Sequence, residues 1–144
     1  MKLQWLVAIA WSVACCAAHA AADEQPTFRA GAAQVDITPT TFPVIVSGGF
    51  LERTADAAHD RLMARALVLD DGQTEVAIVV VDTLIMPRAM LDDIKQRASR
   101  ETGIPADRML ISATHTHSAP SVMAALGTPV DVAYSQLLPD WILQ

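Results

Sequence analysis

The sequence predicts an α/β fold, with a mixed sheet that contains a β-hairpin and a β-α-β crossover. Two apolar, β-rich runs at residues 62–69 and 76–81 are joined by a turn containing Asp71-Gly72, a dipeptide typical of hairpins. Helical spacing follows over residues 89–98, and a further apolar run at 109–113 comes after it. A strand, a helix and a strand in that order favour a parallel, right-handed crossover.

The first residues are expected to be a targeting segment. Lys2 supplies a positive charge, and residues 3–18 carry none. Ala18-His19-Ala20 fits a small-x-small cleavage site, so residues 1–20 are interpreted as a signal peptide, with cleavage as late as residue 22 as an option. A retained N-terminal anchor is the alternative. The favoured interpretation predicts export to the periplasm or the cell exterior.

Composition narrows the chemistry of the remaining chain. Both cysteines, Cys15 and Cys16, lie in the expected signal peptide, so the mature chain would carry no thiol. A metal would then be held by His, Asp, Glu or Tyr rather than by Cys. The sequence has 16 acidic and 10 basic residues, and removal of Lys2 leaves 9 basic ones. This acidic balance argues against nucleic acid as a partner.

A strand and a glycine turn are expected before the hairpin. Residues 28–38 are predicted to form the first strand, which Pro39 ends because proline cannot donate to a sheet ladder. The short apolar run at 44–46 leads into a turn that contains Gly48 and Gly49. Glycines there can let the backbone approach a ligand closely, which makes both candidates for residues near the substrate. An ordinary turn is the favoured explanation for the pair.

A buried strand and a helix follow the hairpin turn. The apolar run at residues 78–81 is continuous rather than alternating, which predicts a strand covered on both faces. Pro87 suits the first position of the helix, and Gly103 suits its C-cap. Near the end of the chain, Asp140 is predicted to cap the start of a further helix. Residues 28–144 are therefore expected to be one domain that is incomplete at its C-terminal end.

The stretch at residues 112–120, Ser-Ala-Thr-His-Thr-His-Ser-Ala-Pro, is the strongest candidate for a functional site. Its two imidazoles, His115 and His117, directly follow the predicted strand 109–113, and neutral imidazole is a common metal ligand. Side chains two apart on a strand share a face, so the two histidines could bind one metal. If the backbone already turns before Pro120, one histidine binds and the other faces the substrate. A polar turn with two exposed histidines is the remaining alternative.

Other polar residues are weaker candidates. Asp82 follows an apolar strand at a place where α/β sheets build their sites, but a helix cap or a hydrogen-bonded carboxylate is favoured. His59-Asp60-Arg61 is interpreted as a surface turn, and Arg65 as the partner of a carboxylate. Serine catalysis has little support, because no acid is identifiable that would orient a histidine beside Ser112, Ser118 or Ser121.

Four blocks in order resemble the neutral/alkaline non-lysosomal ceramidase family. Residues 30–39, Ala-Gly-Ala-Ala-Gln-Val-Asp-Ile-Thr-Pro, are similar to the opening of that family. Residues 47–50, Ser-Gly-Gly-Phe, match more weakly, and residues 59–68 match a His-containing lead into an Ala-Arg-Ala strand. Residues 112–120 are similar to the family's most recognisable block. Together the blocks cover essentially the whole mature chain from Ala30 onward.

The resemblance implies the front portion of a larger α/β hydrolase domain in a secreted or membrane-associated zinc amidohydrolase that cleaves the N-acyl bond of ceramide. It implies that His115 binds Zn²⁺ and that His117 lies beside the metal-bound water and the scissile amide. The family completes its zinc site with another His, a Glu and a Tyr much later in the chain. Tyr134 does not sit in a matching motif, so one family zinc ligand is expected within these 144 residues.

The expected partner is a lipid amide or another small amide, with peripheral membrane contact and no nucleic acid. Two departures bear on the substrate: Ala119 stands where the family usually has Gly, and residues 121–126 lack the family's Gly-rich continuation. One alternative is an inactive, truncated or degenerate domain that binds metal weakly or not at all and serves in interactions. Another is a zinc hydrolase that acts on a different amide.

Overall fold

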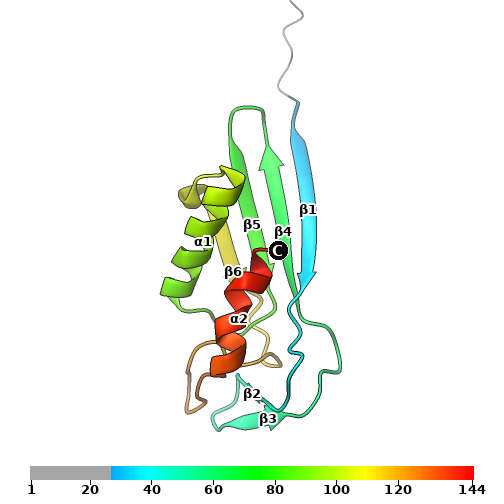
Figure 1. Ribbon diagram of the computed structural model, residues 1–144, viewed down its shortest axis with the longest axis vertical. Helices are drawn as coiled ribbons and strands as arrows, with labels where there is room; N and C mark the ends of the chain where they lie inside the picture. Colours follow the sequence, from blue (N-terminus) through cyan, green and yellow to red (C-terminus); the bar gives the residue numbers. More distant parts are fainter. Residues whose placement is uncertain (1–26) are drawn as a thin grey trace, which may run out of the picture.

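The computed structural model describes residues 27–144 and has the α/β architecture that the sequence predicts (Figure 1). Its main sheet has four strands in the order β1-β4-β5-β6, of which β1, β4 and β5 are antiparallel and β6 runs parallel to β5. The strands are β1 (Arg29–Asp36), β4 (Met63–Asp70), β5 (Glu75–Val81) and β6 (Met109–Ala113). A second, two-stranded sheet consists of β2 (Val44–Val46) and β3 (Arg53–Ala55).

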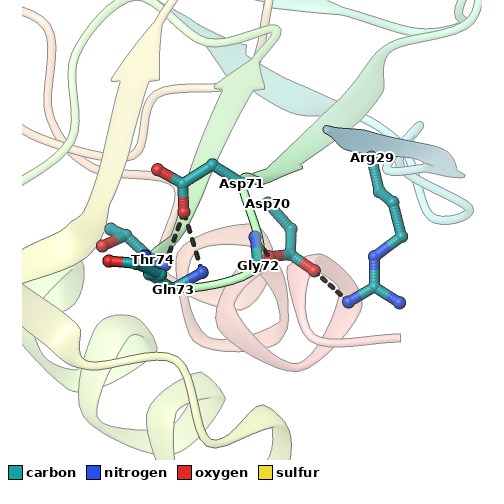
Figure 2. A network of polar contacts seen from close by, with 6 residues as sticks. All are labelled: Arg29, Asp70, Asp71, Gly72, Gln73 and Thr74. Carbon is teal, nitrogen blue, oxygen red and sulfur yellow. Dashed lines mark hydrogen bonds and ion pairs between the residues drawn. The ribbon is translucent and has the colours of Figure 1, made fainter. Parts of the chain in front are cut away.

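The hairpin turn between β4 and β5 is held by its own carboxylates, as Figure 2 shows. One carboxylate oxygen of Asp71 accepts hydrogen bonds from the backbone N–H groups of Gln73 (2.9 Å) and Thr74 (2.7 Å). Asp70 accepts a hydrogen bond of 2.7 Å from the N–H of Gly72, whose φ of 86° suits glycine. These N–H groups favour the charged form of each carboxyl and lower the pKa of Asp70 and of Asp71.

Asp70 also joins the turn to the first strand. Its carboxylate forms an ion pair with Arg29, which lies opposite it in the register between β1 and β4 (Figure 2). The Asp70 carboxylate is buried, and its ion pair with Arg29 joins β1 to the hairpin turn. This contact lies at the end of the sheet farthest from β2 and β3 (Figure 1).

The crossover from β5 to β6 is a helix, α1 (Arg88–Thr102), followed by a short 3₁₀ turn, η1 (Ala106–Arg108). Pro87 has φ −67° and ψ 143°, so it stands immediately before the helix rather than at the predicted first position. Gly103 ends the helix as predicted, with φ 81° and its N–H donating to the carbonyl of Ser99. The parallel pairing of β6 with β5 confirms the predicted crossover.

The hydrophobic core lies between the main sheet and the two helices, which cover the same face of the sheet (Figure 1). Register places alternate residues of each strand on that face, and α1 and α2 (Val132–Ile142) close it. The buried cluster consists of Ile37, Ala64, Val81, Ile94, Ile111, Val122, Tyr134 and Leu138.

The opposite face of the sheet differs from the prediction. Residues 78–81 were expected to be covered on both faces, yet Ile78 and Val80 are partly exposed. Their neighbours Leu67 and Leu110, opposite Ile78 in the register, are exposed. Within residues 27–144, no helix packs on this face, so the continuous apolar run is covered on one side only.

The last helix also corrects a prediction. Asp140 does not cap a helix; α2 begins at Val132, and the cap is Asp131, whose carboxylate accepts a 3.0 Å hydrogen bond from the N–H of Tyr134. Asp140 lies in the last turn and pairs with Arg97 of α1 at 2.6 Å. The helix starts earlier than expected because Tyr134, Leu138 and Trp141 follow helical spacing and all contact the core.

The predicted signal peptide, residues 1–20, and the cysteines within it lie outside the described residues. Among the residues that the structure describes, none of the helices has the length and apolar content needed to cross a bilayer.

Candidate functional site

The loop that carries His115 and His117 leaves the end of β6 and runs beside the segment that follows β5. Thr114 donates its N–H to the carbonyl of Val81 (2.9 Å), and Thr116 donates to that of Thr83 (3.2 Å). His115 has φ 62°, so the extended strand has ended before it. The backbone therefore turns already at His115, before His117, and the two histidines do not share a face by strand alternation.

His115 is oriented by the backbone of the β5–α1 connection. Its Nδ1 lies 2.9 Å from the carbonyl oxygen of Leu84, which can only accept a hydrogen bond. Nδ1 therefore carries the proton, and in the neutral ring the lone pair is on Nε2. This is the arrangement typical of metal-binding histidines, in which a carbonyl fixes the tautomer and the other nitrogen is free to bind.

His117 is held in the same way by the turn after β2. Its Nδ1 lies 2.9 Å from the carbonyl oxygen of Gly48, which again leaves the lone pair on Nε2. The ring stands so close to Gly48 that a Cβ on residue 48 would lie 2.6 Å from His117 Cβ and Cγ. Gly48 also has φ 100°, which other residues rarely adopt. The close approach that glycine permits at residue 48 is to the His117 side chain, and the substrate proximity of Gly48 and Gly49 stays a prediction.

The two imidazole rings are direct neighbours. Their centroids are 5.2 Å apart and the rings meet edge to face at 79°. Both side chains belong to exposed residues, so their Nε2 atoms are within reach of a ligand. The geometry is compatible with a shared metal and with one ligand beside one catalytic neighbour.

An arginine that the sequence did not single out completes the support of His117. Arg53, the first residue of β3, donates a hydrogen bond from its guanidinium to the carbonyl of His117. Three-residue strands such as β3 leave almost no periodic signal, so neither the strand nor the contact was predictable from the pattern. Gly49 lies in the turn between β2 and β3, where an added Cβ would be 3.2 Å from the carbonyl oxygen of Leu51.

The weaker candidates have structural roles. Asp82 accepts a 2.9 Å hydrogen bond from the N–H of Met63 and pairs with Arg65 at 3.0 Å, as the structural alternative for both residues predicts. His59 and Asp60 are almost fully exposed and contact each other at 3.2 Å, which confirms a surface turn.

Neither a serine nor Tyr134 forms a catalytic arrangement in the described residues. Ser121 is buried, and its hydroxyl donates to the carbonyl of Met123 at 3.3 Å. Tyr134 donates its hydroxyl to the carbonyl of Ile37 at 2.8 Å inside the core. Burial is the main cause that raises the pKa of Tyr134, which is therefore a neutral core residue rather than a metal ligand.

A cavity of about 550 Å³ opens beside the histidine loop. It is lined by Thr116 and Ser118, which flank His117, and by Asp82 at the end of β5. Its remaining wall combines polar and apolar side chains: Pro39, Phe42, Val44, Val46, Ala55, Ala57, Ala58, His59, Asp60, Leu62 and Pro120. A cavity with both kinds of lining suits a small molecule that has polar and apolar parts. A second cavity of about 310 Å³ lies between the sheet and the helices, and His115 and His117 line neither cavity.

The described part of the chain supplies only some of the ligands that a metal ion needs. Over residues 27–144, no three His, Cys, Asp or Glu side chains gather at one point that could hold an ion. Zinc usually takes four ligands, three of them from protein at catalytic centres. The donor chemistry of His115 and His117 fits zinc, but these side chains supply two ligands at most.

The sequence and the fold of this chain match those of known proteins. A profile described as "Neutral/alkaline non-lysosomal ceramidase, N-terminal" matches residues 28–130. The chain belongs to this family. Its relatives include the neutral ceramidase of Drosophila pseudoobscura pseudoobscura, which is 30% identical over 123 residues covering 83% of this chain and 17% of that protein. The resemblance expected from the four sequence blocks is confirmed.

Two solved ceramidase structures have the same fold as this chain. The neutral ceramidase of Pseudomonas aeruginosa superposes with a TM-score of 0.71 at 23% identity, covering 84% of this chain and 21% of that one. A structure described as ceramidase complexed with C2 superposes with a TM-score of 0.68 at 24% identity, covering 81% and 20%. The chain thus spans about a fifth of the solved ceramidase chains and about a sixth of the curated relative.

Proposed function

We propose that this chain supplies the N-terminal part of an exported, zinc-dependent amide hydrolase that cleaves the N-acyl bond of ceramide or a related lipid amide. The observation that carries the proposal is the matched state of the two histidines. Each donates Nδ1–H to a backbone carbonyl, at Leu84 and at Gly48, which leaves Nε2 of each ring as the nitrogen that a ligand would meet. In an ordinary polar turn with two exposed histidines, the side chains would not both be expected to bind backbone carbonyls through Nδ1.

In this proposal His115 holds the zinc ion and His117 works beside it. Bound zinc would acidify a water molecule and polarise the carbonyl of the amide. His117 Nε2, an acceptor in the neutral ring, would take a proton there, and the Gly48 carbonyl would stabilise the resulting positive charge through Nδ1–H. Arg53 binds the backbone carbonyl of His117 and so helps to fix the position of this imidazole beside that of His115.

The cavity beside the loop supports an amide with an apolar portion. Thr116 and Ser118, which flank His117, line it, and β2 and the segment before it supply apolar lining, while Asp82, His59 and Asp60 supply further polar groups. The Ala119 departure does not reach this cavity. Ala119 is fully buried, and its carbonyl accepts a 3.2 Å hydrogen bond from the N–H of Ser47. The relative named neutral ceramidase supports a ceramide-like substrate.

A non-enzymatic role is the second candidate, and the partial ligand set favours it. The described residues offer no cluster of three metal-binding side chains, so residues 27–144 alone are expected to bind zinc weakly. The 144-residue chain is therefore expected not to hydrolyse a fluorescent ceramide, and turnover by it would contradict the ligand count.

The test compares His115→Ala with His117→Ala in the whole product of the gene, including whatever the DNA encodes past Gln144. Zinc content is measured by elemental analysis and turnover with a fluorescent ceramide. We expect His115→Ala to lose both zinc and turnover, and His117→Ala to keep zinc and lose turnover by about 100-fold or more. Retained zinc with full turnover in His115→Ala would refute the assignment, and a whole product without zinc would favour the second candidate.

A further inference from the structure

Two loops beside the site are joined into one end of the molecule. The turn between β2 and β3 contacts a second turn at residues 123–128, which is closed by paired hydrogen bonds between Ala125 and Thr128 of 3.1 and 2.9 Å. A Cβ on Gly127 would lie 2.9 Å from the carbonyl oxygen of Phe50, so the two backbones touch. The buried Thr128 hydroxyl also donates to the carbonyl of Leu51 at 3.5 Å.

These joined turns present their large apolar side chains to solvent. Phe50 is 79% exposed, Leu51 80% and Leu126 64%, and Met123 of the same turn is also exposed. We call Phe50, Leu51, Met123 and Leu126 the loop-tip patch. It adjoins the candidate site, because Gly48, which holds His117, lies two residues before Phe50. Exposed apolar groups gathered at one place mark contact surfaces.

The segments that carry the patch contain few charged side chains. Residues 37–51 contain no Asp, Glu, Lys or Arg, and neither do residues 109–130. Two exposed charges adjoin the patch: Glu52 follows Leu51, and Arg53 binds the His117 carbonyl. The whole sequence has a net charge of −6. An apolar patch with an adjoining carboxylate on an acidic protein suits a surface that has no net charge, and it does not suit an anionic one.

We propose that the loop-tip patch docks this chain on a zwitterionic lipid surface, with Phe50, Leu51 and Leu126 entering the boundary between headgroups and acyl chains. Separate side chains on turn tips insert between lipids, whereas a flat apolar face matches another protein better. The inference rests on the proposed function, since a lipid amide presents its N-acyl bond at that depth. Docking through this patch brings the His117 side of the molecule to the bond.

The experiment places a reporter in the patch and a matched one outside it. Phe50→Trp puts indole in the patch, and Phe28→Trp puts it at a residue that is also strongly exposed (65%). Phe28 precedes β1, at the end of the sheet opposite β2 and β3 (Figure 1). Each variant, in the form that lacks the expected signal peptide, is mixed with phosphatidylcholine vesicles whose acyl chains carry bromine. Its emission is compared with that of the unsubstituted form, in which residues 21–144 contain Trp141.

We expect the added emission of Trp at position 50 to shift to the blue and to be quenched, and that of Trp at position 28 to be unchanged. Leu126→Trp should behave like Phe50→Trp, which guards against a local folding fault in one variant. Salt should not weaken the quenching, and anionic lipid should not strengthen it. Equal quenching at 50 and 28, or none at 50 and 126, would overturn the docking surface.

The readout contains no turnover, so the two proposals fail separately. A gene product that hydrolyses ceramide without quenching at position 50 keeps the proposed function and loses this surface. Quenching at position 50 in a product without zinc keeps the lipid contact and loses the hydrolase.

Discussion

The contact between Gly48 and His117 makes a sharp prediction about Gly48→Ala. Residue 48 has φ 100°, and an alanine Cβ there would lie 2.6 Å from two carbon atoms of His117. One of these is the His117 Cβ, which is fixed to the backbone and cannot swing away as a side-chain tip can. Either the β2–β3 turn or the histidine loop must move, and the hydrogen bond from Nδ1 to the residue 48 carbonyl is then lost.

Gly103→Ala is the matched control, because it isolates the backbone part of this effect. Gly103 has φ 81° but an added Cβ would meet nothing within 4 Å. The left-handed backbone alone costs an L-residue about 1–2 kcal/mol, which both variants share. At residue 48 a lost hydrogen bond adds about 1 kcal/mol and overpacking about 1–3 kcal/mol. We therefore expect Gly48→Ala to lower the free energy of unfolding by about 2–4 kcal/mol more than Gly103→Ala does.

Urea unfolding of the 144-residue chain, followed by far-ultraviolet circular dichroism, measures the difference. Gly31→Ala serves as a second control, since Gly31 has neither a positive φ nor a neighbour within 4 Å; its change should stay within about 0.5 kcal/mol. NMR signals of the His117 ring should move in Gly48→Ala and stay in place in Gly103→Ala. Equal destabilisation by both variants, with unchanged His117 signals, would refute the close approach.

Three further changes probe the scaffold. Asp131→Ala removes the α2 cap and should lower the free energy of unfolding by about 1 kcal/mol, measured by urea unfolding; an unchanged midpoint would contradict the cap. Tyr134→Phe leaves the Ile37 carbonyl without its donor and should lower the free energy of unfolding by about 1–2 kcal/mol, measured by urea unfolding. The zinc content of the whole product should not change, and a loss of zinc would show that Tyr134 is a ligand. The pKa of Asp70 is lowered in the folded chain, first by the Gly72 N–H and then by Arg29, so its stabilisation is complete above the ordinary value of 3.8 and disappears as the pH falls below it. Unfolding midpoints in acid should accordingly depend less on pH in Asp70→Asn, and an identical acid profile would show that the carboxylate contributes nothing.

Local chemistry accounts for the parts of the fold that the sequence predicted. The Asp71-Gly72 turn, the positive φ of Gly103 and the apolar strands are each determined by neighbouring residues, and each appears as expected. The start of the last helix was predicted wrongly, at Asp140, because an Asp before an apolar run resembles a helix cap. Asp131 is the cap because Tyr134 and Leu138 must reach the core together.

The covering of the sheet could not be predicted by the same means. A continuous apolar run such as residues 78–81 shows that both faces favour burial, but it does not show which elements provide the cover. In the described residues the helices cover one face, and Leu67 and Leu110 stay exposed on the other.

The sequence predicted which two histidines form the candidate site, but not how their side chains are oriented. Spacing singled out His115 and His117, yet their orientation depends on Leu84 and Gly48, which lie 31 and 69 positions away in the sequence. Such carbonyl contacts carry no sequence signature, since every residue has a carbonyl. What selects them is the sheet, because β6 runs parallel to β5 and brings the ends of both strands together beside β2.

The two histidines therefore depend on different parts of the fold. His115 is fixed by the β5–α1 connection, which belongs to the main sheet, whereas His117 is fixed by Gly48 and Arg53 of the β2–β3 hairpin. The same hairpin carries half of the loop-tip patch. A ligand or lipid surface that moves this hairpin would shift the His117 imidazole and leave His115 in place. The division matches the proposed roles, because a metal ligand must stay fixed while the group beside the amide must adapt to the substrate.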